Sequence, residues 1–347
     1  MLTSALGTSF ALALILPQTL NGGSALQTHC VQQPSIWVCP RKRMVSVTQA
    51  ASSISTVAGL SIKGRSETRA KPNQDAFWVH EDLIEGVLSV GVLDGHGKKG
   101  HDVAQDLAVR LPSAIAHELV RFEAIGGARD AEWMSEALSS AVARAQAGVL
   151  GNKDVLSGTS GSTMVACLLH HESRQLIVGN VGDSRAILGL QADSGEWYGT
   201  PLSEEHTTSR HLERQRIDAA QGRIDGNGNV WFGPVGIAMT RALGNGVMKG
   251  AGVICDPEIR AAQDLELPSQ CSQTKKFTLL ATDGVWDVMT NDEAASIVGT
   301  SVTAATPPAE GAKLALESLT RECQARWQAG VPIEQDVDDI TAVLVLF

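Results

Sequence analysis

Short runs of strand length, rich in Val, Ile and Leu, recur along the chain, and several follow one another through tight turns. Such runs predict β-strands, and their succession through short turns favours antiparallel pairing. The predicted strands cover residues 87–93, 162–169, 175–181, 186–190, 277–281 and 341–346.

Four other segments carry apolar residues at the spacing of one helix face. They predict helices over residues 102–122, 131–150, 292–298 and 309–327. Before the third, the stretch from Thr290 to Glu293 has the composition of a helix cap. Strand runs and helix pairs lie in separate blocks without strict alternation, which indicates an α+β layered domain.

Chain length and charge narrow the class of protein. With 347 residues, the chain suits one large domain better than two once a leader is subtracted. The formal net charge of −10 argues against nucleic acid as the main partner, because phosphate backbones are bound by an excess of Lys and Arg. Six scattered cysteines without a CxxC pair indicate free thiols in a reducing compartment.

The first 66 residues contain no Asp or Glu, which separates a leader over residues 1–63 from a domain over 64–347. The apolar stretch 10–17 is too short to span a bilayer, so stable membrane insertion is not expected. An acid-poor leader rich in Ser and Thr fits an organelle transit peptide and a disordered tail equally well. Localisation therefore stays open, with cytoplasm or nucleus as the default.

Four aspartates, Asp94, Asp183, Asp283 and Asp338, stand at the ends of strand-like apolar runs. A carboxylate in this position lies at a strand end, and several such ends that converge would form a cluster of oxygen ligands. The pattern predicts a metal site bridged by carboxylates. Oxygen ligands suit hard cations such as Mg²⁺ or Mn²⁺.

Two turns carry most of the candidate chemistry. In the turn 94–97, Asp94 and His96 alternate with Gly95 and Gly97, so a carboxylate and an imidazole lie beside a backbone that can bend around an ion. The stretch 283–287 repeats the carboxylate and glycine and ends in a second acid. Each turn alone also fits an ordinary hairpin or helix cap.

Nine motifs, in this order and spacing, resemble the metal-dependent protein serine/threonine phosphatases of type 2C. Nine short matches in order make coincidence an unsatisfactory explanation. The motifs are PNQDAF at 72–77, VLDGHG at 92–97, SGST at 160–163, GDSRA at 182–186, LSEEH at 202–206, TRALGN at 240–245, DPEI at 256–259, ATDGVWDVM at 281–289 and DDITAVLV at 338–345.

The resemblance implies a four-layer α/β/β/α sandwich, with two central antiparallel β-sheets flanked by helices. It implies a catalytic domain over 64–347, with a flap at about 191–257, and two Mn²⁺ or Mg²⁺ ions in one site. His96 matches the general acid of the family. Carried over by position, the metal residues are Asp75, Asp94, the Gly95 carbonyl, Asp283, Asp338 and Asp287.

Three departures from the family pattern limit this transfer. Ala70 holds the position of the phosphate-binding arginine, so Arg69 is the predicted replacement, with Arg65 and Lys71 as alternatives. The acid ahead of SGST is replaced around residues 157–158, which counts against a third ion although Asp287 matches its partner. Asn245 stands where the family motif has Asp.

The expected function is hydrolysis of phosphoserine and phosphothreonine in proteins by a bridging water that metal ions activate, without a covalent intermediate. The expected partners are phosphorylated proteins, and the chain is expected to be a monomer because no heptad pattern occurs. Two alternatives stay open. One is a pseudophosphatase that binds a partner, and the other is a phosphatase for small metabolites.

Overall fold

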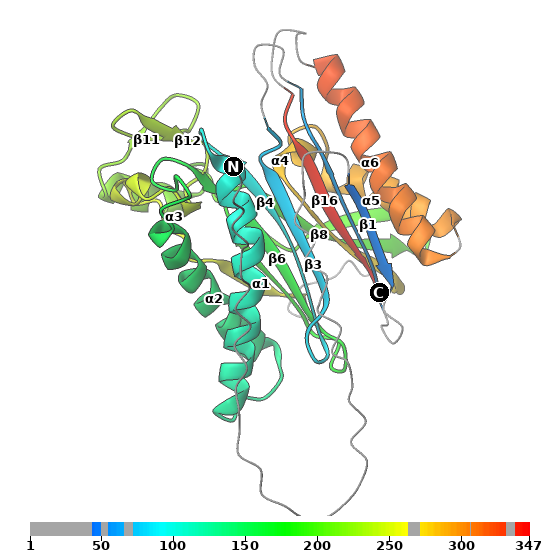
Figure 1. The fold of residues 1–347 in the computed structure, drawn as a ribbon. Coiled ribbons are helices and arrows are strands. Elements are labelled where there is room, and N and C mark those ends of the chain that lie inside the picture. Colours follow the sequence, from blue (N-terminus) through cyan, green and yellow to red (C-terminus); the bar gives the residue numbers. More distant parts are fainter. Residues whose placement is uncertain (1–43, 50–54, 66–71, 263–270, 306, 331–336) are drawn as a thin grey trace, which may run out of the picture. The chain divides into compact units, whose positions relative to one another are not determined.

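The computed structural model describes residues 44–49, 55–65, 72–262, 271–305, 307–330 and 337–347. The chain divides into two units, residues 1–34 and residues 35–347, and every described residue belongs to the second unit. Two antiparallel sheets form the centre of this second unit (Figure 1).

The first sheet has six strands in the order β1-β2-β16-β15-β8-β9. Its strands are β1 Met44–Gln49, β2 Thr56–Ile62, β8 Arg185–Ala192, β9 Trp197–Pro201, β15 Cys271–Ala281 and β16 Ile340–Leu346. The second sheet has seven strands in the order β13-β5-β4-β6-β7-β14, with β3 paired to β4. These are β3 Asp75–Ile84, β4 Val87–His96, β5 Gly161–Ser162, β6 Met164–His170, β7 Leu176–Val181, β13 Leu243–Gly244 and β14 Glu258–Ala261.

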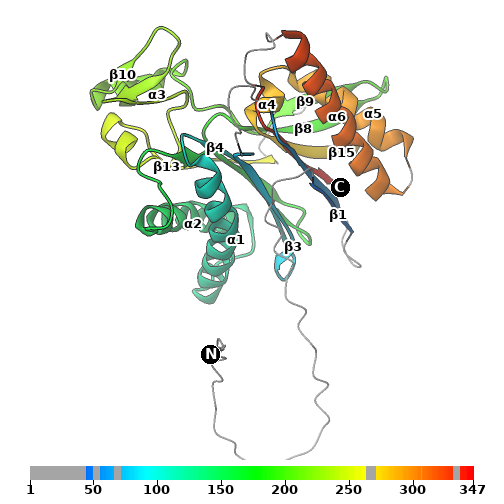
Figure 2. The same cartoon turned by 45° about the horizontal axis from the view of Figure 1, so that its top comes forward.

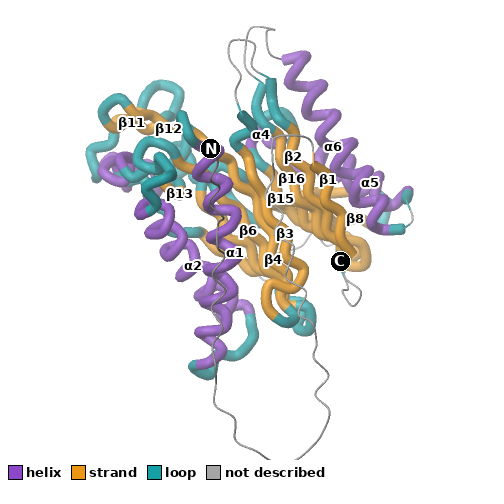
Figure 3. The backbone as a smooth tube through the Cα atoms, in the orientation of Figure 1, coloured by secondary structure: helices purple, strands orange, loops and turns teal. Residues whose placement is uncertain are grey.

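Helix pairs cover the outer faces of the two sheets (Figures 2 and 3). Helix α1 packs on β3 and β4 and α2 on β7, whereas α6 packs on β2 and β16 and α5 on β8 and β9. The helices are α1 Gly100–Ala124, α2 Ala131–Gly151, α3 His211–Ala219, α4 Asp283–Trp286, α5 Asn291–Ala304, α6 Pro308–Gly330 and the 3₁₀ helix η1 Val247–Ala251. Among the residues that the structure describes, no helix combines the length and apolar character that a membrane span requires.

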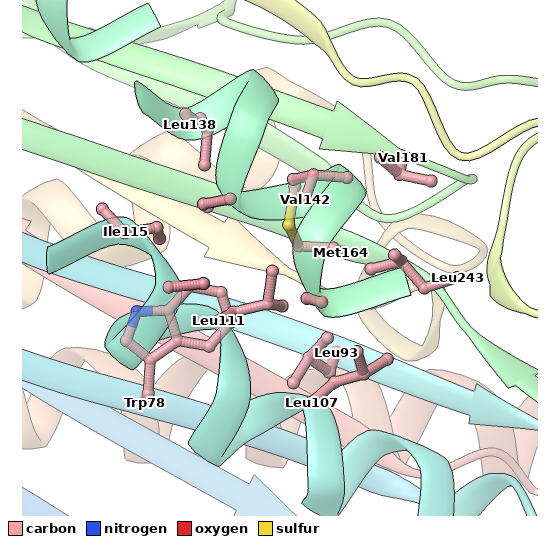
Figure 4. Packing of buried hydrophobic residues seen from close by; sticks show 14 of the residues in the cluster. Trp78, Leu93, Leu107, Leu111, Ile115, Leu138, Val142, Met164, Val181 and Leu243 are labelled. Atoms are coloured by element: carbon pink, nitrogen blue, oxygen red, sulfur yellow. The ribbon is translucent and has the colours of Figure 1, made fainter. Parts of the chain in front are cut away.

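Three apolar clusters hold these elements together. One joins α1 and α2 to the second sheet, and Figure 4 shows Leu107 and Leu111 of α1 beside Trp78 of β3. A second fills the space between the sheets, where Phe77 meets Val343 and other aliphatic residues. The third joins α5 and α6 to the first sheet. Burial on both faces explains why the central strands are continuous apolar runs.

Close packing of aromatic rings requires glycine on neighbouring strands. A Cβ atom on Gly91 would lie 2.2 Å from the Trp78 indole, and one on Gly59 would lie 2.5 Å from the Phe77 ring. The Trp78 Nε1–H donates to Ser89 Oγ at 3.0 Å, which satisfies the polar atom of the buried indole. The indole therefore occupies space that Gly91 leaves open.

The structure confirms the four predicted helices, each as part of a longer helix, and with the antiparallel strands the mixed class of the fold. The predicted strand 162–169 is divided between β5 and β6, and the predicted strand 175–181 begins one residue before β7. It also confirms the cap of α5. The Thr290 side chain accepts from the Glu293 N–H, and the Glu293 carboxylate accepts from the Thr290 N–H.

The predicted boundary between leader and domain does not coincide with the start of the sheet. Strand β2, Thr56–Ile62, lies within the predicted leader, yet it pairs along its length with β16, and Val57, Ala58 and Leu60 are buried. Strand β1 extends the sheet further toward the N-terminus. A buried strand has no need of Asp or Glu, so the lack of acids did not mark a boundary. The rest of the predicted leader lies outside the described residues.

We expect Gly91→Ala to destabilise the protein by about 1–3 kcal/mol, because the added methyl group overpacks the contact with Trp78. Urea unfolding followed by tryptophan fluorescence measures the change. Gly151→Ala is the matched control, since nothing lies within 4 Å of a Cβ atom at that position. Equal stability of both variants would contradict the packing described here.

Candidate active site

Two aspartates lie side by side at one end of the second sheet. Asp75 begins β3, and the antiparallel register places it opposite Asp94 near the end of β4. Thr163 fixes this strand end, because its Oγ1 accepts from the Asp94 N–H at 3.0 Å and its N–H donates to the Asp94 carbonyl at 2.9 Å. The carboxylates of two neighbouring strands are thereby brought to one edge.

The first sheet brings two further aspartates to the same place. Asp283 follows β15 and begins α4, and Asp338 lies just before β16. Thr282 links the sheets, since its hydroxyl donates to Asp75 Oδ2 at 3.0 Å while its N–H donates to the Thr341 carbonyl at 3.0 Å. The predicted metal acids therefore meet where the two sheets meet.

The pKa values of these acids reflect the concentration of like charge at the junction of the sheets. Burial raises the pKa of Asp75, Asp94 and Asp283 well above its ordinary value, and the neighbouring carboxylates raise it further. Asp338 contributes to all three shifts. A cation among these groups would replace repulsion by attraction.

The arrangement fits hard cations that keep part of their water shell. Asp283 Oδ1 is buried and accepts no hydrogen bond from the residues described, so it offers an acceptor without a donor. In the described ranges, no group of three or more His, Cys, Asp or Glu side chains is arranged to hold a metal ion by itself. A sparse set of carboxylates leaves coordination positions for water and substrate, as Mg²⁺ sites commonly do.

Gly95 lies beside Asp94, where three backbone segments pack closely together. A Cβ atom there would lie 2.4 Å from the carbonyl oxygens of both Gln74 and Gly100, so no other residue fits without a shift of the backbone. The Gly95 N–H donates to the Gln74 carbonyl at 3.1 Å, which fixes the orientation of this peptide beside Asp94.

His96 is the last residue of β4, and its Nε2 lies 2.5 Å from Asn245 Oδ1. Burial lowers the pKa of His96, while the hydrogen bond to Asn245 opposes the shift. Asn245 has a φ of 46°, in the left-handed region that Asn tolerates, so its backbone conformation helps to hold the amide at the imidazole. Asn245, which stands where the family motif has Asp, is therefore in direct contact with His96.

The predicted phosphate-binding residue, Arg69, lies outside the described residues, as does Lys71. The other alternative, Arg65, is exposed. Its N–H donates to the Val337 carbonyl at 3.1 Å, so its backbone runs beside the segment that carries Asp338. Asp287 follows α4, and its side chain is exposed at one edge. Partial loss of contact with water and the negative charge of Glu205 raise the pKa of its carboxylate.

Asp339 has a structural role that the sequence did not indicate, whereas Asp183 is one of the four aspartates that the sequence predicted to converge. Asp339 is 2% exposed, and its two oxygens accept from the Gly64 N–H at 2.7 Å and the Gln74 N–H at 2.8 Å. It therefore joins the backbone at Gly64 and at Gln74 to the segment that leads into β16. Asp183 joins the predicted cluster, and burial and Glu205 raise its pKa to about 7.

The segment from β9 to β14 folds beside this centre around a small apolar core that includes Ile217 and Met248. It contains α3 and a three-stranded sheet of β10 Arg223–Ile224, β11 Val230–Phe232 and β12 Val235–Ile237. Glu213 anchors α3, because its buried carboxylate pairs with Arg216 at 2.5 Å and Arg241 at 2.6 Å.

Comparison with known proteins identifies the class of protein to which the paired sheets and the carboxylate centre belong. The family model for Protein phosphatase 2C matches residues 89–329. The probable protein phosphatase 2C 72 of Arabidopsis thaliana is 33% identical over 267 residues, which cover 73% of this chain and 74% of the relative. The probable protein phosphatase 2C 14 of Oryza sativa subsp. japonica is also 33% identical, over 79% of this chain and 57% of the relative.

Solved structures share the fold. The serine-threonine phosphatase 2C from Toxoplasma gondii aligns with a TM-score of 0.67 and 21% identity, over 91% of this chain and 100% of that one. A C. elegans sex determining protein aligns with a TM-score of 0.63, over 84% of this chain and 64% of that one, also at 21% identity. The chain belongs to the protein phosphatase 2C family. By class it is a protein serine/threonine phosphatase.

We expect Asp94→Asn to raise the melting temperature of the metal-free protein at pH 7.5. The raised pKa of Asp94 means that its ionised form destabilises the folded state, and this cost grows as pH rises through the folded pKa. Removal of this charge should therefore stabilise the metal-free folded state. Thermal unfolding in excess EDTA measures it, with the exposed Asp218→Asn as control. A lower melting temperature for Asp94→Asn would contradict this account.

We expect Asn245→Asp to move the descending limb of kcat against pH upward by about one pH unit. A carboxylate in place of the amide favours the imidazolium and raises the pKa of His96, which is lowered in the present protein. Because an acid catalyst must be protonated, activity then persists to higher pH. Asn245→Gly, which keeps the positive φ and removes the contact, should not extend the limb. A pH profile unchanged by Asn245→Asp would exclude His96 as the acid.

Proposed function

We propose that the protein hydrolyses phosphoserine and phosphothreonine in proteins at the carboxylate centre, with two Mn²⁺ or Mg²⁺ ions and without a covalent intermediate. The observation that carries the proposal is the convergence of Asp75, Asp94 and Asp283, whose pKa values are all raised, with Asp338 among them. Carboxylates clustered in this way destabilise the folded protein when no cation lies among them. Binding of cations is therefore the physical explanation for the cluster.

The acids of the centre would contact the cations in different ways. Asp94, Asp283, Asp338 and the Gly95 carbonyl offer the direct ligands. Asp75 is 3% exposed and already accepts from the Thr282 hydroxyl, so it suits a contact through water. Asp287 lies at the exposed edge, where it would reach a further ion only with help from other ligands.

Bound cations supply two effects to phosphate-ester hydrolysis: a lowered pKa of a water that becomes the nucleophile, and neutralisation of charge on the phosphoryl group. The direct attack of water explains why no nucleophilic side chain is required. The very slow uncatalysed reaction makes such strong electrostatic help necessary.

His96 is the proposed acid for the departing serine or threonine oxygen. The Asn245 amide oxygen can only accept, so Nε2 carries a hydrogen in this contact. The proton that titrates is then the one on Nδ1, an atom that is buried and has no hydrogen-bond partner among the described residues. Arg69 is the proposed phosphate-binding residue, with Arg65 and Lys71 as alternatives.

The test is phosphate release from a phosphothreonine peptide by the full-length protein, first stripped of metal and then supplied with Mn²⁺ or Mg²⁺. We expect turnover only with metal and a loss of at least about 100-fold in Asp94→Ala and in Asp283→Ala. Circular dichroism shows whether each variant is folded. Turnover without metal, or in both variants, would contradict the mechanism, and no turnover in a folded, metal-loaded protein would favour a pseudophosphatase.

A further inference from the structure

A cavity of about 540 Å³ lies between the carboxylate centre and the segment that carries α3. Asp183, Asp283 and Asp287 line it from the two central sheets and α4. Asp225 lines it from the loop that follows β10, and Arg214 from α3. The cavity therefore continues from the proposed reaction centre toward the surface, where a substrate chain would extend.

Negative charge dominates the wall of this cavity. Apart from Asp283, whose charge the proposed cations would neutralise, the described lining residues include Asp183, Asp225, Asp287 and Glu205 but one guanidinium, that of Arg214. The Arg214 Nε–H donates to the Thr208 carbonyl at 3.3 Å. Glu205 is paired with Arg185, which lies outside the wall. The wall thus has more carboxylates than cations to match them.

Asp183 gives independent evidence that a hydrogen-bond donor binds in the cavity. It is 9% exposed, and its Oδ1 is buried without a hydrogen bond to any described residue. Its position is fixed, because Gly182 before it has a φ of 109° and donates its N–H to His206 Nδ1 at 3.1 Å. A buried carboxylate oxygen without a donor is costly, and a cationic group in the cavity would satisfy it.

Of the other acids of the wall, Asp225 and Glu205 have partners within the protein, whereas the unpartnered Asp283 Oδ1 is assigned to the cations of the proposed reaction centre. Asp225 accepts from the Trp231 Nε1–H at 2.8 Å and from the Asn229 N–H at 3.0 Å, which holds the loop around it. Apart from Asp283, the demand for an external donor therefore falls on Asp183, which lies beside the exposed carboxylate of Asp287. This pattern fits one extended cation better than an anion.

We propose that this cavity is a specificity subsite for a lysine or arginine side chain that lies close to the phosphorylated residue of the substrate protein. The inference rests on the proposed function, since the cavity borders the same reaction centre. A lysine or arginine side chain has an apolar stem and a charged end, so it can extend through the cavity to reach Asp183. The same wall repels a glutamate or a second phosphate.

The test uses phosphothreonine peptides that carry one lysine at each position from three residues before to three residues after the phosphothreonine. Each is compared with an acetyl-lysine peptide, which keeps the length and loses the charge, and with a glutamate peptide. We expect lysine at one or two positions to raise kcat/KM about tenfold over acetyl-lysine, mainly through KM. Glutamate at those positions should lower it.

Variants connect the preference to the cavity. In Asp183→Asn, the ratio of kcat/KM for lysine to that for acetyl-lysine should fall to within about twofold. The exposed Asp218→Asn, on α3 but outside the cavity wall, should keep the wild-type ratio. The ratio is internal to each variant, so a general change in rate does not affect it. If Asp183→Asn does not fold, the comparison of lysine with acetyl-lysine peptides in the unaltered protein still decides whether the protein prefers a cationic side chain.

Hydrolysis of p-nitrophenyl phosphate separates this inference from the proposed function. Metal-dependent hydrolysis of that small substrate, with equal rates for all peptides, would overturn the subsite and leave the phosphatase intact. Absence of hydrolysis of every substrate would overturn the proposed function itself. If Asp183→Asn changed only the Mn²⁺ concentration required, equally for all peptides, the cavity would serve an inorganic cation and the proposal would be wrong.

Discussion

The convergence of buried carboxylates at the junction of the two sheets is the interaction on which the rest of the structure depends. Each of Asp75, Asp94 and Asp283 has a raised pKa because burial removes its carboxylate from water and because its neighbours carry the same charge. Repulsion of this kind would separate the strand ends if nothing held them. The Thr282 hydroxyl and the Asp339 carboxylate do so, because they join segments that are more than 200 residues apart in the chain.

The remaining architecture holds this junction rigid on both sides. Helix pairs and glycine-aromatic contacts keep the sheets closely packed, so the strand ends have little freedom to move apart. The segment around α3 is fixed by the buried Glu213 and its two arginines, and it forms one wall of the cavity beside the centre. Catalytic and substrate-binding groups therefore lie on a scaffold that is closely packed on both sides.

Much of this could be predicted from the sequence, because the signals are local. Apolar runs on buried strands and an aspartate after each run indicated both the sheets and the convergence of Asp94, Asp183, Asp283 and Asp338. Strand β2 was missed because an acid-poor buried strand has the same composition as an acid-poor leader. The role of Asp339 and the contact of Asn245 with His96 could not be predicted, since both depend on pairing between distant segments.

The number of Mn²⁺ ions that the full-length protein binds tests the central claim most directly. Electron paramagnetic resonance of free Mn²⁺, titrated into metal-free protein at neutral pH, measures this number. The account predicts two ions per chain in the unaltered protein and weaker, incomplete binding in Asp283→Asn, which keeps the shape of the side chain and removes its charge. Binding of no ion, or identical binding by the folded variant, would contradict the claim that these carboxylates converge to hold cations.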